Sequence, residues 1–167
     1  RTALRGWLAE PGRGWSFGIV PPSTPKPRRE EARTLRALIT GMAGFAGSHL
    51  ADCLLTHSGI DVHGIVRPGH DTSNLDHIQS RIVLQAADLG DYPRVCQVLS
   101  SVRPDRVYHL AAQASTRRSW ESPRETLVTN VTIQLSLLQA IVDGGLCPRV
   151  LIVGSADEYG LVGEEDL

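Results

Sequence analysis

The sequence predicts an α/β fold in which a doubly wound parallel sheet carries helices on both faces. From residue 35 onward, short apolar runs rich in Val, Ile and Leu alternate with longer segments whose apolar residues recur three and four positions apart. Strands that alternate with helices favour a parallel sheet that is buried on both faces. With 167 residues, 41% of them hydrophobic, the chain is long enough for one such domain.

Five strands and three helices are predicted along the chain. The strands are the apolar runs at residues 35–40, 62–66, 81–87, 106–112 and 149–154. The helices are the segments with helical spacing: 46–57 with a start near Phe45, 92–102, and 123–143. Residues 67–80 show no clear period, and no element is assigned to them.

Residues 1–34 differ from the rest of the chain. They contain "EPGRGW" and "VPPSTPKPRREE" and have no sustained period. This composition predicts a flexible leader or extension, followed by one domain over residues 35–167. The basic residues of this segment are interpreted as a solvated tail.

The overall composition favours a small-molecule ligand. A formal net charge of -1 gives no reason to expect a nucleic acid or an anionic membrane as a partner, and no apolar run approaches the length of a membrane span. The three cysteines are widely spaced, which predicts free thiols in a reducing cytoplasm. The six histidines show no ligand spacing, so no metal site is expected.

A glycine-rich turn follows the first predicted strand. In "TGMAGFAGSHL", Gly41, Gly44 and Gly47 lie three residues apart, and a helix begins at about Phe45. Glycine permits the tight turn, lets the backbone approach a pyrophosphate, and allows the helix to pack closely on the strand. The amides of the first helical turn, including those of Phe45 and Ala46, then face the anion. The pattern predicts a dinucleotide-binding, Rossmann-like domain.

The end of the second predicted strand indicates which dinucleotide is bound. An acidic residue at this point would bind the ribose 2′-hydroxyl of NAD, whereas an arginine would pair with the 2′-phosphate of NADP. The sequence reads "GIVRPG", which places Arg67 there, and the first carboxylate follows only at Asp71. We therefore expect NADP(H) as the cofactor.

Four motifs in order resemble the extended short-chain dehydrogenase/reductase family, in its nucleotide-sugar branch. They are "TGMAGFAGSHLA", "AADLGDY", "RPDRVYHLAAQAS" and "VGSADEYG", and the resemblance covers about residues 36–163. It implies that Asn130 braces the backbone after the fourth strand. It also implies that further cofactor-binding residues flank the adenine or line the nicotinamide side: Asp88, Leu89, Leu110, Ala111, Ala112 and Gln113.

The catalytic residues of this family are only partly present in the chain. The resemblance implies that Ser155 hydrogen-bonds the reacting sugar oxygen, while a Tyr-x-x-x-Lys pair exchanges the proton. Tyr159 cannot provide that pair, because Gly163 stands four residues later and the only lysine is Lys26. We expect that the C-terminal strands and the substrate lobe lie beyond this chain, which would then be a fragment without turnover.

Three functions remain open. The motifs look most like GDP-4-dehydro-6-deoxymannose reductases, which implies an NADP(H)-dependent reduction of a 4-keto nucleotide sugar. The alternative is a GDP-mannose 4,6-dehydratase, whose carboxylate base would be Asp157 beside Glu158, although such dehydratases usually read Thr-x-Glu where this chain reads Ser-Ala-Asp. The third is a dinucleotide-binding protein without catalysis.

The resemblance also implies contacts outside the cofactor loop. Ser115 and Arg118 are expected to bind the substrate together with Ser155, and the substrate is expected to be a small nucleotide sugar. Family members commonly dimerise through long helices that here would include residues 122–142, so a homodimer is expected.

Overall fold

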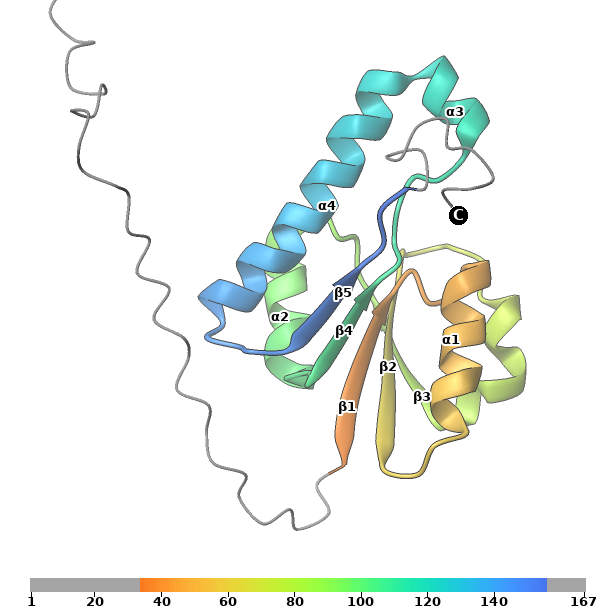
Figure 1. Ribbon diagram of the computed structural model, residues 1–167, viewed down its shortest axis with the longest axis vertical. Helices are drawn as coiled ribbons and strands as arrows, with labels where there is room; N and C mark the ends of the chain where they lie inside the picture. The colour runs from red at the N-terminus through yellow and green to blue at the C-terminus, as the bar shows by residue number, and fades with distance from the viewer. Residues whose placement is uncertain (1–33, 156–167) are drawn as a thin grey trace, which may run out of the picture. The chain divides into compact units, whose positions relative to one another are not determined.

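The computed structural model describes residues 34–155, which form one five-stranded sheet (Figure 1). All neighbouring strands are parallel, in the order β3-β2-β1-β4-β5. Their bounds are β1 Leu35–Thr40, β2 Ile60–Val66, β3 Ile82–Ala86, β4 Arg106–His109 and β5 Arg149–Ile152. The predicted α/β fold with a doubly wound parallel sheet is confirmed. The predicted leader, except Thr34, and the candidates Asp157 and Glu158 lie outside the described residues.

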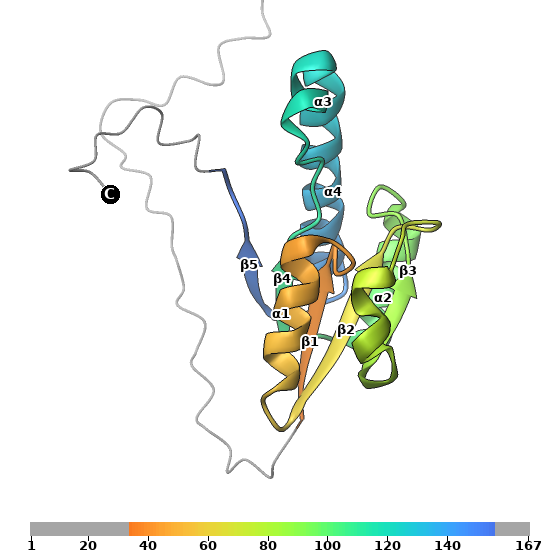
Figure 2. The same cartoon turned by 90° about the vertical axis from the view of Figure 1, so that its right-hand side faces the viewer.

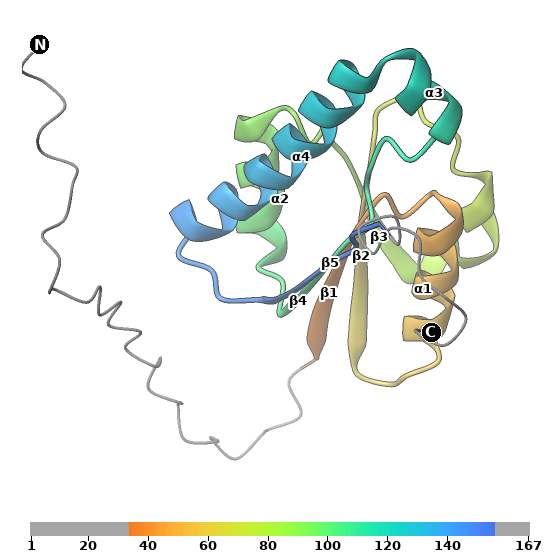
Figure 3. The same ribbon diagram turned by 45° about the horizontal axis from the view of Figure 1, so that its top comes forward.

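Helices cover both faces of the sheet, as Figure 3 shows. One face is covered by α1 (Phe45–Leu55) and the 3-10 helix η1 (Ser73–Arg81), and the other by α2 (Tyr92–Val102) and α4 (Pro123–Asp143). Each face has its own apolar core. Leu38 of β1 and Leu99 of α2 belong to one cluster, while Ile39 of β1 and Leu75 of η1 belong to the other. Successive side chains of β1 therefore point to opposite faces of the sheet.

The predicted strands differ from the observed ones mainly at their ends. The strand predicted at 106–112 ends at His109, because the chain leaves the sheet at Leu110 to meet the loop after β1. The strand predicted at 149–154 ends at Ile152, and the one predicted at 62–66 begins two residues earlier. Period-2 apolar patterns do not mark where backbone pairing stops.

Two short helices were not predicted. The η1 helix lies in the segment to which no element was assigned, and α3 spans Thr116–Glu121 just before α4. Both are mostly exposed, so they have little of the apolar periodicity that reveals a helix in a sequence. The three predicted helices are present; the first, predicted to residue 57, ends at Leu55.

The long helix α4 packs on the sheet only along its C-terminal half. There Ile133, Leu137 and Ile141 are buried, whereas the N-terminal half and α3 extend beyond the carboxyl ends of the strands (Figure 2). By length and apolar composition alone, α4 could cross a membrane, a test that core helices of soluble proteins also pass. The helix thus has one face in the core and one face exposed.

Candidate dinucleotide site

The glycine loop connects β1 to α1 at the carboxyl edge of the sheet. Gly41 has a φ of +70°, which favours glycine, and its amide donates to the Ile65 carbonyl at 3.1 Å. A Cβ at Gly41 would lie 2.9 Å from the Cα of Ala111. At Gly47 a Cβ would lie 2.7 Å from the Cα of Met42 and closer still to the Gly41 carbonyl oxygen. Neither position has room for a side chain, so the loop packs directly on the start of α1 and on the segment after β4.

The N-terminus of α1 provides donors for an anion. Gly44 is the N-cap, and it supplies no side-chain hydrogen bond to the first turn, which contains no acidic residue. The first amides of a helix have no acceptor within the helix, and the helix dipole adds a partial positive charge. Phe45, Ala46 and Gly47 carry these amides. This cradle fits the pyrophosphate of a dinucleotide.

The segment Leu110–Gln113, predicted to line the nicotinamide side, is fixed at two points of its main chain. The amide of Ala111 donates to Thr40 Oγ1 at 3.2 Å. The side chain of Asn130 accepts from the Gln113 amide at 2.7 Å and donates to the Gln113 carbonyl at 3.2 Å. The prediction that Asn130 braces this backbone is confirmed. The segment runs beside the glycine loop, as the contact of Gly41 with Ala111 requires.

Two buried polar residues beneath the loop were not predicted. Thr40 and His109 occupy paired positions at the ends of β1 and β4, and Thr40 Oγ1 lies 2.8 Å from His109 Nδ1. Burial lowers the pKa of His109 below its ordinary value. Their signal in the sequence was a polar residue at the end of each strand, two positions after a buried apolar residue, Leu38 or Val107.

The end of β2 places Arg67 at the same carboxyl edge of the sheet. Arg67 is exposed, and it directly follows the last residue of the strand. The nearest carboxylate along the chain, Asp71, accepts hydrogen bonds from the Ser73 amide at 2.9 Å and the Ser73 hydroxyl at 3.0 Å, which lower the pKa of Asp71. Asn74 was not predicted as a site residue either. Its side chain donates to the Ala43 carbonyl at 2.9 Å and connects η1 to the glycine loop.

The residues after β3 have local partners. Asp88 Oδ1 accepts from the Gly90 amide at 2.8 Å, and the cap of α2 is Asp91, whose side chain accepts from the Arg94 amide. The side chain of Leu89 is 6% exposed and belongs to the core beneath α2 and α4. The Leu89 side chain therefore contributes to this core and does not contact a cofactor, whereas Asp88 is exposed.

The predicted substrate residues lie beyond the carboxyl ends of the strands, at the same edge of the sheet as the glycine loop. Ser115 caps α3 by accepting from the Arg118 amide at 3.3 Å, and the Arg118 guanidinium pairs with Glu125 at 2.5 Å. Ser155 is exposed three residues after the end of β5. Ser115, Arg118 and Ser155 thus share the carboxyl edge of the sheet.

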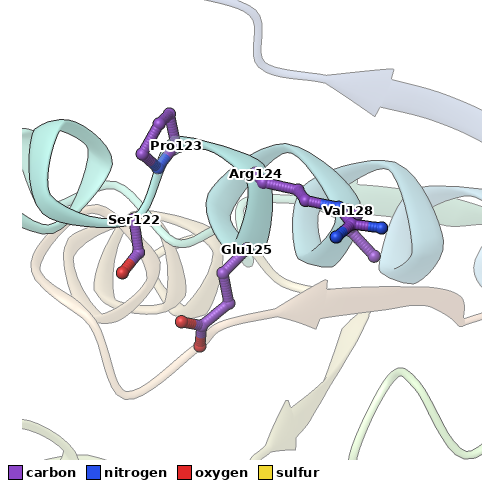
Figure 4. Close-up of a pocket in the computed structure, with 5 residues that line it drawn as sticks. All are labelled: Ser122, Pro123, Arg124, Glu125 and Val128. Atoms are coloured by element: carbon purple, nitrogen blue, oxygen red, sulfur yellow. The ribbon is translucent and has the colours of Figure 1, made fainter.

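A hollow of about 480 Å³ lies over the first turns of α4 (Figure 4). It is lined by Ser122, Pro123, Arg124, Glu125 and Val128, and none of the predicted site residues is among them. Over residues 34–155 no group of three or more His, Cys, Asp or Glu side chains is placed to hold a metal ion.

One family of known proteins matches most of the chain. The sequence profile of the family described as GDP-mannose 4,6 dehydratase matches residues 38–167. The chain is 37% identical over 140 residues to a GDP-mannose 4,6-dehydratase of Vibrio cholerae, an alignment that covers 77% of this chain and 37% of that protein. It is 33% identical over 138 residues to GDP-mannose 4,6 dehydratase 1 of Arabidopsis thaliana, with 74% and 38% covered. The chain thus spans about two fifths of the length of these relatives.

Solved structures agree with the fold. A dTDP-glucose 4,6-dehydratase of Streptomyces venezuelae, with NAD bound, matches with a TM-score of 0.67 and 28% identity, covering 78% of this chain and 42% of that one. A UDP-glucose 4-epimerase of Stenotrophomonas maltophila, also with NAD bound, matches with a TM-score of 0.67 and 30% identity, covering 75% and 38%. Both are nucleotide-sugar enzymes that share this sheet and its covering helices.

Proposed function

The chain belongs to the GDP-mannose 4,6 dehydratase family of nucleotide-sugar enzymes, and we propose that it is the cofactor-binding part of an NADP-linked 4,6-dehydratase that acts on GDP-mannose. The observation that carries the proposal is the cradle of Gly41, Gly44 and Gly47 at the uncapped start of α1. The reductase expected from the sequence has less support, because the family profile and the curated relatives described above are dehydratases.

The choice of NADP over NAD rests on the residues after β2. Arg67 is exposed at the strand end, and its guanidinium can form a charge-assisted fork with a 2′-phosphate. The competing carboxylate of Asp71 already accepts two hydrogen bonds from Ser73. The pyrophosphate would lie on the amides of Phe45, Ala46 and Gly47, with the nicotinamide beside the segment that begins at Leu110.

The chain's own residues would then hold and deprotonate the sugar. When bound, the nicotinamide supplies reversible hydride transfer. The hydroxyl of Ser155 donates a hydrogen bond to the sugar oxygen at C4. The carboxylate of Asp157 takes the proton from C5 and passes it to the C6 hydroxyl, which leaves as water while a double bond forms between C5 and C6. Glu158 contacts the sugar beside it. Ser115 and Arg118 are the proposed outer contacts of the substrate.

The reductase is the second candidate, because one observation favours it. The chain reads Ser155, Ala156 and Asp157 where dehydratases usually read Thr-x-Glu. The two reactions differ in what they consume. GDP-mannose supplied alone, without added NADPH, would be consumed by a dehydratase and left unchanged by a reductase. The test requires the protein that carries this chain together with a Tyr-x-x-x-Lys pair, and mass spectrometry of the nucleotide sugar gives the result.

A homodimer through α4 is part of the proposal. The exposed face of this helix carries Leu127, Val131, Leu135 and Val142, each more than half exposed. Their spacing of four, four and seven residues makes one continuous apolar stripe, which a second α4 can cover. Sedimentation analysis of Leu135→Glu tests it: the wild type is expected to be a dimer and the variant a monomer, and a wild-type monomer at high concentration would contradict it.

We also propose a cytoplasmic location. Cys53, Cys96 and Cys147 are all free thiols in the structure, which suits a reducing compartment. Cys53 and Cys147 are exposed, so labelling with a thiol reagent in intact and lysed cells tests the location.

A further inference from the structure

A buried polar pair lies directly beneath the glycine loop. Thr40 and His109 are register partners at the ends of β1 and β4, and they are 0% and 5% exposed. Their side chains meet at 2.8 Å between Thr40 Oγ1 and His109 Nδ1. The buried residues two positions earlier in each strand, Leu38 and Val107, are apolar and belong to the same core cluster. Polar groups are costly in such a place unless they are hydrogen-bonded, so packing alone does not explain the pair.

Donor and acceptor can be assigned along the chain of hydrogen bonds from Ala111 through Thr40 to His109. The Ala111 amide donates to Thr40 Oγ1, so the oxygen acts there as an acceptor. Burial lowers the pKa of His109, which favours the neutral ring, and a neutral imidazole has one accepting nitrogen. We assign the tautomer that carries its proton on Nε2, in which Nδ1 accepts the Thr40 hydroxyl hydrogen. The lone pairs of Thr40 are then turned toward the Ala111 amide.

The amide held in this way belongs to the candidate dinucleotide site. Ala111 lies in the segment beside the glycine loop, and its Cα and N occupy the space that a Cβ on Gly41 would need. If Ala111 moved, the glycine loop would therefore lose the main-chain contact against which Gly41 packs. Asn130 holds the segment two residues later, at Gln113, but it makes no bond with Ala111 in the structure.

We infer that His109 is a positioning residue of the dinucleotide site: by orienting the Thr40 hydroxyl, it holds the main chain of Ala111 against Gly41. Without an acceptor at position 109, the buried hydroxyl must turn to find another partner, and Ala111 loses its acceptor. The inference rests on the proposed function, because it gives the pair a role in dinucleotide binding.

Two substitutions at position 109 separate this role from packing. His109→Leu removes the acceptor, whereas His109→Asn keeps a side-chain oxygen that can accept from Thr40. Val107→Ala is the matched control, because it loosens the same strand and the same core without touching the pair. The exchange rate of the Ala111 amide is measured by NMR on each folded chain, and the dissociation constant of NADPH by calorimetry.

For His109→Leu we expect exchange at Ala111 to be about fivefold faster or more, with NADPH binding about tenfold weaker. His109→Asn should restore both values to near wild type, and Val107→Ala should leave both nearly unchanged. Equal effects of His109→Leu and Val107→Ala, or no rescue by His109→Asn, would overturn the inference.

The outcomes also distinguish this inference from the proposed function. If the folded wild type binds neither NADPH nor NADH, the proposed function fails, and exchange at Ala111 alone decides whether His109 positions that amide. Unchanged exchange in His109→Leu would then overturn the inference. If His109→Leu does not fold, Thr40→Val takes its place, since it keeps the shape of threonine and removes the hydroxyl, with Thr40→Ser as its control.

Discussion

Replacing Gly47 with alanine places a methyl group where the structure has no space. The new Cβ would lie 2.7 Å from the Cα of Met42 and 2.8 Å from the Met42 carbonyl oxygen, with the Gly41 oxygen nearer still. All three are backbone atoms, so a side-chain rotation cannot relieve the contacts. The first turn of α1 must move away from the glycine loop.

Two opposing contributions determine how much Gly47→Ala changes the free energy of unfolding. Overpacking of a close contact costs about 1–3 kcal/mol, and the better helix propensity of alanine returns up to about 1 kcal/mol. Since the contacts involve backbone on both sides, the upper part of the range applies. We expect a net loss of about 1–2 kcal/mol, which lowers the melting temperature by about 4–8 °C for a domain of this size. NADPH binding should weaken by about tenfold or more, because the amides of the first turn are displaced.

The control is Gly59→Ala. Unlike Gly47, Gly59 has a positive φ, +80°, but no atom lies within 4 Å of a Cβ built there. The substitution should therefore lower stability by about 1–2 kcal/mol through backbone strain and leave NADPH binding unchanged. Thermal melts and calorimetric titrations of both variants give the comparison. A Gly47→Ala chain that melts higher than wild type and binds NADPH normally would refute the reasoning about this contact.

Three further predictions concern the same edge of the sheet. Arg67→Ser should weaken NADPH binding by about 10- to 100-fold, since it removes a charged hydrogen-bond partner, and leave NADH binding unchanged; equal loss of both would contradict the fork with the 2′-phosphate. Asn130→Leu removes both side-chain bonds to Gln113 and should cost about 2 kcal/mol in the free energy of unfolding, measured by urea denaturation; an unchanged midpoint would show that the two bonds add nothing. His109, whose pKa is lowered by burial, binds its proton more readily in the unfolded chain, so its contribution to stability is full above pH 6.5 and is lost as the pH falls below it. Melting temperatures at pH 7.5 and 5.5 should therefore differ more for wild type than for His109→Asn, and equal differences would contradict this.

The sheet and its main helices could be predicted because their signal is local. Five apolar runs and three helical periods follow from which residues must be buried, and the structure has all eight of these elements. The exposed helix α3 and the 3-10 helix η1 bury few residues, so periodicity gives no sign of them. β4 ends early, at His109, because the next residues pack against Gly41, about 70 positions away in the chain. The apolar pattern of a single segment carries no information about such a distant contact.

The site was predictable where a residue type is tied to one backbone geometry. Gly41 and Gly47 were recognised because only glycine allows the turn and the close packing, and both requirements are present. The part played by Asn130 followed from family resemblance. Thr40 and His109 were missed, because their relation depends on strand register, which no single segment of sequence determines.

The central claim is that a dinucleotide binds on the amides at the start of α1. An NMR titration of the ¹⁵N-labelled chain with NADP⁺ tests it most directly, because it reports both binding and its location. The account predicts saturable shifts concentrated at Gly44, Phe45 and Ala46, with smaller shifts near Arg67 and Ala111. A folded chain whose α1 amides do not shift, or whose shifts lie only over α4, would contradict it.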